Sequence, residues 1–311
     1  DGSFLRLYKD GVEVDSRAYS QPIAHSSNLL LIGQGTGSTS WTWVGELDEV
    51  ALYGTALSAE RVQEHFAAAQ DVGVVIEPGA VDVTVRDNRI VGGLEALRLS
   101  AVASGRIFAN DIGGGVRGVA LDAAFTGSIA DNRIHSSLTG VSYRAPAALS
   151  GNEIFGNTVG VVAQLAGTDE ALGYVGATEP NVIRDNETGV QLSGRMRGQI
   201  IADNQVGVTG SGLLGGDDFD TANEIRGNVR GVDAFAGIVQ FNRISANEIG
   251  IVATDEQRLR HNEIFRNGST AVLLDGVNDV RIVHNTLYGT TGDLVVVRGG
   301  ASEAQLRSNI L

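Results

Sequence analysis

The strongest constraint on the fold is a short motif, Asn-x-Ile, that recurs at intervals of 18 to 29 residues over most of the chain. Asn opens ten of the eleven copies and Gln opens the other, at Asn88, Asn110, Asn132, Asn152, Asn181, Gln199, Asn223, Asn242, Asn262, Asn285 and Asn309. A period near 20 residues is typical of a solenoid, in which each copy forms one coil stacked on the next. We number the coils 1 to 11 by these opening residues, which form the first Asn column.

Other positions repeat in step with the opening residue. Two residues after it, every copy carries a branched aliphatic side chain, at Ile90, Ile112, Ile134, Ile154, Ile183, Ile201, Ile225, Ile244, Ile264, Leu287 and Leu311. Five residues after it, six consecutive coils carry the second Asn column, at Asn157, Asn186, Asn204, Asn228, Asn247 and Asn267. Eight residues after it stands a glycine in seven coils, at Gly118, Gly140, Gly160, Gly189, Gly207, Gly231 and Gly250. We predict that the aliphatic column points into the core.

Each coil is expected to consist of short strands separated by sharp corners. Val81, Val83 and Val85 alternate with polar residues, which is the pattern of a half-buried strand. Asn and Gly are predicted to occupy the corners, because both tolerate the left-handed conformation that a sharp bend needs. Stacked coils place equivalent residues about 4.8 Å apart. At that spacing the amides of the second Asn column can form a hydrogen-bonded ladder that fixes the register.

From about residue 76 to residue 311, this pattern resembles the right-handed parallel β-helix repeat family of pectate-lyase-like proteins. The resemblance implies an all-β fold, with a right-handed parallel β-helix of about ten to eleven coils over residues 81–311. A leucine-rich horseshoe is disfavoured, because the corners are too short for helices. The β-helix architecture serves lyases, hydrolases, epimerases, phage tailspikes, adhesins and inert stalks, so it does not by itself specify an activity.

Residues 1–69 form a different module. A hairpin is predicted around residues 9–11, and Ser58 is expected to cap a helix that runs to about Ala69. With the GELDEVALY segment between them, this order resembles the C-terminal part of a laminin G-like, concanavalin-like jelly roll, which implies a partial β-sandwich. Some relatives bind calcium or glycans, so the resemblance marks Asp48 as a candidate calcium-proximal residue; a structural role at a strand end is the alternative. Residues 70–80 are expected to link the modules and to supply the first β-helix strand.

Composition excludes several classes of function. The chain has a net charge of −14 and no cysteine, which excludes disulfides and argues against nucleic-acid binding, because phosphates would be repelled. No apolar run reaches the length of a membrane span. The family resemblance implies a secreted or cell-surface protein. Because the sequence opens within a module and closes on an uncapped coil, we expect upstream and downstream parts of a longer chain.

Two insertions interrupt the repeat at equivalent corners, after Val161 and after Val208. They leave the same corner two coils apart, so the loops should stand about 10 Å from each other and wall a groove over coils 4 to 6. The residues predicted to bind a ligand there are Asp169, Tyr174, Arg195, Arg197, Asp217, Asp218 and Asp220. Their aromatic and charged groups suit a polysaccharide or glycoconjugate, and the acids at 217, 218 and 220 could also hold Ca²⁺. Solvated loops without a ligand are the alternative.

No catalytic residue is assigned, because the motifs of polygalacturonases and mannuronan epimerases are missing. Outward polar residues at comparable corners are expected not to pair across coils; they are Asp122, Arg144, Gln164 and Ser193. His261 and His284 precede the opening Asn of consecutive coils, so their rings should lie about one strand spacing apart. Two histidines could begin a metal platform, but no third ligand column is visible, which favours simple stacking at the surface.

Two functions from different classes follow from the sequence. The first is a secreted or surface-exposed structural and adhesive protein, in which the jelly roll binds glycans and the β-helix is a rigid spacer. The second is a carbohydrate-active enzyme, a polysaccharide lyase or hydrolase, with its site in the groove of coils 4 to 6. Convergence of acidic and basic side chains in that groove would favour the enzyme.

Overall fold

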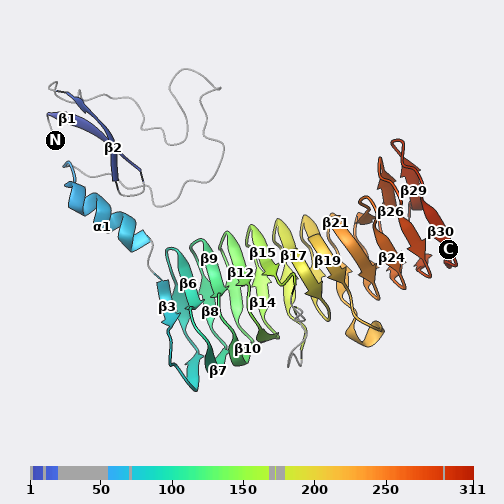
Figure 1. The fold of residues 1–311 in the computed structure, drawn as a ribbon, viewed down its shortest axis with the longest axis horizontal. Helices are drawn as coiled ribbons and strands as arrows, with labels where there is room; N and C mark the ends of the chain where they lie inside the picture. The colour runs from blue at the N-terminus through green and yellow to red at the C-terminus, as the bar shows by residue number, and fades with distance from the viewer. Residues whose placement is uncertain are drawn as a thin grey trace. The chain divides into compact units, whose positions relative to one another are not determined.

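The computed structural model describes residues 3–9, 12–19, 55–69, 72–167, 172, 179–289 and 291–311. The chain divides into two compact units, Asp1–Ala69 and Gln70–Leu311. Regular structure in the described parts is almost entirely β, with one short α-helix, as the sequence predicts (Figure 1). No helix in these parts is long and apolar enough to cross a membrane.

The described part of the first unit contains a hairpin and the helix. Strands β1 (Phe4–Lys9) and β2 (Val12–Ala18) pair antiparallel, and α1 spans Ala59–Ala69. The backbone N–H of Arg61 donates to the Ser58 hydroxyl at 3.2 Å, which confirms the predicted N-cap. The rest of the expected jelly roll, including Asp48, lies outside the described residues.

The second unit is a parallel β-solenoid with three faces. One face is a sheet of ten three-residue strands, each of which begins directly after an opening Asn or Gln. Its strands are β5 (Arg89–Val91), β8 (Asp111–Gly113), β11 (Arg133–His135), β14 (Glu153–Phe155), β16 (Val182–Arg184), β18 (Ile200–Ala202), β20 (Glu224–Arg226), β22 (Arg243–Ser245), β25 (Glu263–Phe265) and β28 (Thr286–Tyr288). Because every neighbouring pair is parallel and in register, each motif stacks on the same motif of the next coil.

The second face is the longest sheet. Its strands are β3 (Val72–Ile76), β6 (Glu95–Leu99), β9 (Arg117–Leu121), β12 (Thr139–Tyr143), β15 (Val159–Gln164), β17 (Thr188–Met196), β19 (Val206–Leu214), β21 (Arg230–Gln240), β23 (Ile249–Val252), β26 (Thr270–Asp275) and β29 (Asp293–Arg298). In the middle coils, β17, β19 and β21 are longer and continue onto the third face.

Separate strands form the third face at both ends of the solenoid. In the first coils they are β4 (Val83–Arg86), β7 (Ala103–Phe108), β10 (Phe125–Ala130) and β13 (Ala147–Ser150). In the last coils they are β24 (Arg258–Arg260), β27 (Arg281–Val283) and β30 (Gln305–Arg307), and β24 pairs with the end of β21. A single 3₁₀ turn, η1 (Phe219–Thr221), follows β19.

The aliphatic column lies in the core, as predicted. Ile90 is 4% exposed and the next nine members, Ile112 to Leu287, are 0% exposed. Leu311, in the last coil, is 66% exposed. At about 25 cal/mol per Å² of apolar surface removed from water, this continuous column is a large part of what holds the coils together.

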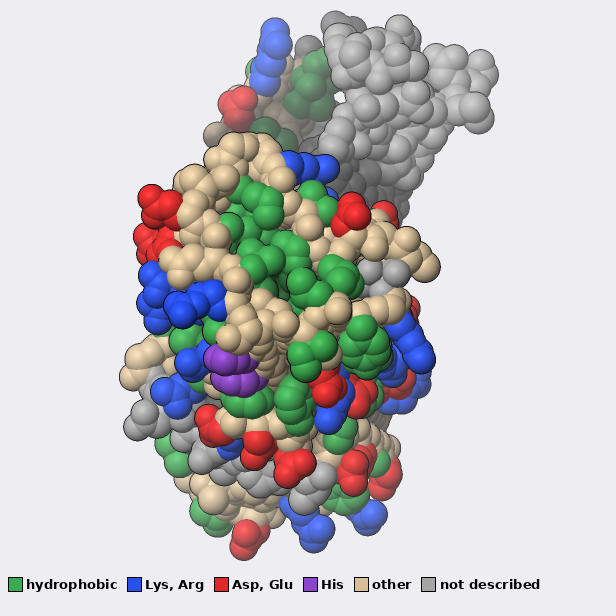
Figure 2. Space-filling view, turned by 90° about the vertical axis from the view of Figure 1, so that its right-hand side faces the viewer, with side chains coloured by type: hydrophobic (Ala, Val, Ile, Leu, Met, Phe, Trp, Pro, Cys, Tyr) green, Lys and Arg blue, Asp and Glu red, His purple; other side chains and the backbone are tan. Residues whose placement is uncertain are grey.

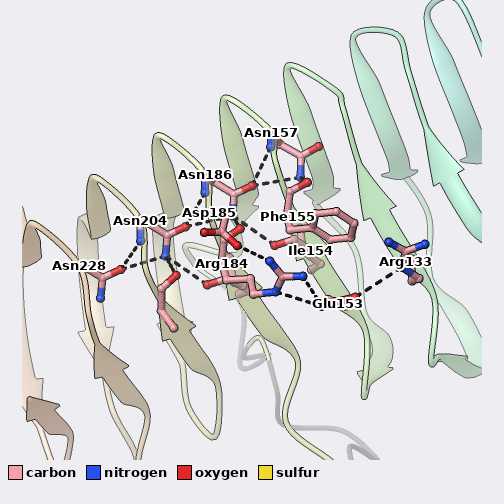
Figure 3. A network of polar contacts seen from close by, with 12 residues as sticks. Arg133, Glu153, Ile154, Phe155, Asn157, Arg184, Asp185, Asn186, Asn204 and Asn228 are labelled. Carbon is pink, nitrogen blue, oxygen red and sulfur yellow. Dashed lines mark hydrogen bonds and ion pairs between the residues drawn. The ribbon is translucent and has the colours of Figure 1, made fainter. Parts of the chain in front are cut away.

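Both Asn columns form hydrogen-bonded ladders. In the second column, the Asn186 side-chain oxygen accepts from the backbone N–H and the amide of Asn157, at 2.9 and 3.1 Å. Figure 3 shows this column from Asn157 to Asn228, and the same pair of bonds recurs at each step down to Asn267. The first column forms a longer ladder from Asn88 to Asn309. The series of side-chain hydrogen bonds is broken at Gln199, because the Gln199 amide donates to the carbonyls of Arg197 and Gly198.

The expected backbone role of Asn at the corners is wrong. The residue with a positive φ is the one before most of these Asn residues, for example Asp185 at 54° and His261 at 55°, and no Asn among the described residues has a positive φ. Asn181 and Asn223 are exceptions, since they follow Pro180 and Ala222, and Ala222 has a φ of −61°. Glycine does occupy four of the left-handed positions, as expected, at Gly151, Gly156, Gly198 and Gly227. Most Asn residues that follow a left-handed turn are buried. Their amides can therefore form hydrogen bonds between coils. Asn is therefore required for its hydrogen bonds, and its tolerance of an unusual conformation is not used.

The glycine column also has another role than the one expected. These seven residues do not have a positive φ. A Cβ at any of them would lie 2.4 to 2.7 Å from a carbonyl oxygen of the next coil, and at Gly207 that oxygen belongs to Gly231. The column is glycine because adjacent coils approach too closely for a side chain.

Candidate functional site

A shallow groove crosses coils 4 to 6 on the outer face of the second sheet, over β15, β17 and β19. Its volume is about 250 Å³, and it is lined by Val162, Ala163, Gln164, Gln191, Leu192, Ser193, Gly210 and Ser211. The parallel register sets Gln164, Ser193 and Ser211 side by side along the solenoid axis. Gly210 contributes no side chain, which leaves the floor open at that point.

The groove can form hydrogen bonds but carries no ionisable group among its lining residues. Gln164 and Gln191 supply amides that both donate and accept, and the two serines supply hydroxyls. Val162 adds an apolar side chain to the lining. Polar groups of this kind on a rigid sheet suit a neutral ligand rich in hydroxyls. The groove therefore lies in the predicted coils, although none of the seven predicted ligand-binding residues lines it.

The structure brings together the side chains of one pair of the predicted residues, Arg197 and Asp217. Arg197 Nη1 lies 3.5 Å from Asp217 Oδ2, and the Asp217 side chain is 86% exposed. Arg195 is exposed on β17, in register with Leu213. Asp169 and Tyr174, the two predicted residues of the first insertion, lie outside the described residues.

The acidic loop after β19 has a structural use for one carboxylate. Asp218 caps η1, where its Oδ1 accepts from the backbone N–H groups of Asp220 and Thr221, each at 3.2 Å. Asp220 is exposed. Within the described ranges, no group of three His, Cys, Asp or Glu side chains is arranged to hold a metal ion. Sequence reasoning missed the cap, although Asp is one of the residues that are strongly preferred at an N-cap.

Charged side chains converge on the same face, over coils 1 to 3. Asp122 lies 3.1 Å from Arg98 Nε and 3.5 Å from Arg144 Nη1, and Glu95, which is fully buried, contacts Arg117. The expectation that Asp122 and Arg144 do not pair across coils is wrong. Both occupy the same position of consecutive coils, 22 residues apart, and this spacing could have identified the pair.

A second charge network connects coils 3 to 5 on the ten-stranded face. Glu153 lies between Arg133 at 3.5 Å and Arg184 at 2.5 Å, as Figure 3 shows. The hydrogen bonds to Glu153 and Asp185 raise the pKa of Arg184. Both guanidinium groups lie over the Phe155 ring. The network joins neighbouring coils and satisfies its own charges, so it needs no ligand.

His261 and His284 stack on each other, which is the arrangement that the sequence favoured over a metal site. The ring centroids of His261 and His284 are 5.3 Å apart, and His261 also stacks on Phe241 at 4.9 Å. Burial lowers the pKa of His261, and the nearby His284 and Arg260 lower it further. The buried Nδ1 of His261 has no hydrogen-bond partner among the described residues, so the neutral ring is the form that the folded protein favours.

We expect the depressed pKa of His261 to make the solenoid less stable in acid. Between the unfolded pKa of about 6.5 and the lower folded pKa, the unfolded chain binds more protons, so stability falls as pH falls through this window. A His261→Phe variant keeps the stack on Phe241 and removes the titration. Its melting temperature, measured from about pH 7.5 down to about pH 5, should fall less than that of the wild type. Identical pH dependence in the two proteins would contradict the prediction.

Comparisons with known proteins found one family match and two similar solved structures. Residues 1–63 match the family described as the concanavalin A-like lectin/glucanases superfamily, of the laminin G type. A crystal structure of the periplasmic alginate epimerase AlgG is similar at 16% identity and a TM-score of 0.36; a mutant of the same protein gives equal values. The alignment covers 67% of this chain and 51% of AlgG, so this chain spans about half of that length. No curated protein sequence matches. A likeness this weak carries no information on activity.

Proposed function

We propose that this chain is a structural and adhesive segment of a secreted or cell-surface protein, in which a rigid β-solenoid carries glycan-binding sites. The observation that carries the proposal is the groove over coils 4 to 6, whose lining offers amides and hydroxyls and no ionisable side chain. Saccharide hydroxyls both donate and accept hydrogen bonds, so amide and hydroxyl groups are suitable partners for them.

The role of spacer rests on the continuity of the core. One cluster of buried hydrophobic residues extends from Ile76 to Leu287, and the ladder of the first Asn column runs alongside it from Asn88 to Asn309. In a solenoid each coil contacts its neighbours, so a continuous core and a ladder that is broken only at the Gln199 side chain favour a stiff rod. Such a rod can hold a binding surface at a fixed distance from an attachment point.

Binding without cleavage is favoured by the chemistry of the groove. Hydrolysis or elimination needs an acid and a base, or a metal and a base, held together at the ligand. The acidic and basic side chains of this face converge over coils 1 to 3 instead, where they pair with each other. The lectin/glucanase family that matches residues 1–63 includes both binders and enzymes by its description, and the glycan-binding role of that module is part of the proposal. The relation of the solenoid to pectate-lyase-like proteins is also part of the proposal.

The expected result is binding of neutral glycans without turnover. A Gln164→Ala, Gln191→Ala double variant should bind the best glycan of a neutral panel about tenfold more weakly, because two hydrogen bonds are lost. The control is Gln205→Ala, Gln305→Ala, which changes two exposed glutamines away from the groove. Isothermal calorimetry measures affinity, while reducing ends and unsaturated products report cleavage. Equal weakening by both variants would place the site elsewhere.

Turnover of any glycan in the panel would instead favour the carbohydrate-active enzyme. If an Asp217→Ala, Asp218→Ala variant abolished that turnover while its melting temperature stayed unchanged, the acidic loop after β19 would be assigned to catalysis. Repeating the assay with and without calcium tests whether this loop uses the ion.

A further inference from the structure

A strip of arginines runs along the third face of the last coils. Arg258 on β24 and Arg281 on β27 are neighbours in register on adjacent parallel strands, and Arg260 and Arg307 follow two residues further along β24 and β30. All four side chains are exposed. We call these four residues the arginine strip. Figure 2 shows basic side chains gathered beside histidine near this end of the solenoid.

The strip has few internal partners. Most arginines on the solenoid lie within 4.0 Å of a carboxylate, as Arg98, Arg184 and Arg243 do. Within the described ranges, neither Arg258 nor Arg307 makes an ion pair, and Arg260 donates to the neutral Gln240 at 2.8 Å. Only Arg281 among the four has an acid partner in those ranges, Asp279 at 3.3 Å. Like charges side by side on adjacent strands are destabilising, and a bound anion would remove that repulsion.

The surroundings of the strip restrict what can bind. The turns before the three strands carry Glu256, Asp279 and Glu303, so an acidic row borders one edge. His261 and His284 form the corner at the other edge. The basic surface is therefore a narrow band of two rows across three adjacent strands, with Arg258 and Arg281 in one row and Arg260 and Arg307 in the other. It lies on a chain of net charge −14. A wide polyanion such as duplex DNA or an anionic membrane would meet the acidic row as well and be repelled.

We propose that the arginine strip binds a single linear polysaccharide that carries carboxylate or sulfate groups. Guanidinium groups recognise both oxyanions through paired hydrogen bonds. Arg258 and Arg281 are one strand spacing apart, about 4.8 Å, and a sugar unit in an extended chain has nearly this length. An extended acidic peptide, whose side chains on one face repeat at about 6.7 Å, is the competing ligand, and poly-glutamate is its probe in the test. This site is separate from the groove over coils 4 to 6 and does not depend on it.

The test measures binding of the whole chain to polygalacturonate, dextran sulfate and neutral dextran by biolayer interferometry across a salt series. We expect binding to at least one of the charged polymers and none to dextran; the charged polymer preferred identifies the recognised group. Arg258→Gln with Arg260→Gln should weaken binding at least tenfold and reduce the slope of log affinity against log salt by about 2. The matched control, Arg89→Gln with Arg226→Gln, removes two exposed arginines elsewhere and should change affinity less than about twofold.

Several outcomes would overturn the proposal. They are an absence of binding to both charged polymers, an equal loss in the control variant, and binding of duplex DNA or poly-glutamate as tight as that of the polysaccharide. Circular dichroism verifies that each variant is folded. If the double variant is not folded, the single Arg258→Gln variant replaces it, since this side chain has no partner to lose within the described residues. Its expected effect is a loss of at least threefold and a salt slope smaller by about 1.

Discussion

Replacing Asn228 by Leu is expected to destabilise the solenoid by several kcal/mol. The Asn228 side-chain oxygen accepts from the backbone N–H and the amide of Asn204, both at 2.9 Å. Its own amide donates to Asn247 and to the carbonyl of Ile201. Leucine can replace none of these bonds, and each buried group left unpaired costs about 1–3 kcal/mol.

The matched control for this substitution is Asn88→Leu. Asn88 opens the first ladder but is exposed, and its side-chain oxygen accepts no hydrogen bond within the described ranges. The same chemical change there should cost less than about 1 kcal/mol, because water can replace the lost partner. Urea unfolding followed by circular dichroism compares the two variants. If Asn228→Leu were as stable as Asn88→Leu, the ladder would be a geometric coincidence of stacking without energetic weight.

The repeat in the sequence predicted the solenoid because one physical requirement acts on every coil. A side chain such as Ile225 must be apolar in each copy, since the copies stack into one core, and a column of Asn is satisfied when it continues into the next coil. The same logic did not reveal backbone conformation. Asp and Gly recur at the left-handed corner, but residues as different as Phe241 and His261 also occupy it, so residue type marks that position only in some coils.

The candidate site was harder to predict than the fold for a related reason. The groove depends partly on a missing side chain, at Gly210, and on uncharged residues such as Gln191 that are common on any surface. The predicted acids drew attention because they are charged, yet Asp218 caps a turn and Asp217 pairs with Arg197. Charge pairs between coils could have been found by comparing positions one period apart, as Arg133 and Glu153 show. A groove on the surface of a sheet produces no comparable repeat in the sequence.

Ile225→Ala should also lower stability strongly, and it tests which face of the short strands is buried. Ile225 is 0% exposed and lies between Ile201 and Ile244 in the core. Truncation removes apolar contacts and leaves a cavity that the ladders and adjacent coils prevent from collapsing, so we expect a loss of about 2–5 kcal/mol. The cavity would lie in the middle of the stack. Because each coil contacts its two neighbours, it should weaken the packing on both sides.

Arg226→Ala is the control for this substitution, since its side chain is exposed on the opposite face of the same strand. Arg226 makes no ion pair in the described part of the chain, and its carbonyl bond to the Asn228 amide is kept in the variant. Its loss should cost less than about 0.5 kcal/mol. Chemical denaturation gives both values under one condition. A cost at Arg226 equal to that at Ile225 would mean that the faces of β20 are reversed, and the alternation of inward and outward residues in every coil would then have to be reassigned, because the register connects β20 to all its neighbours.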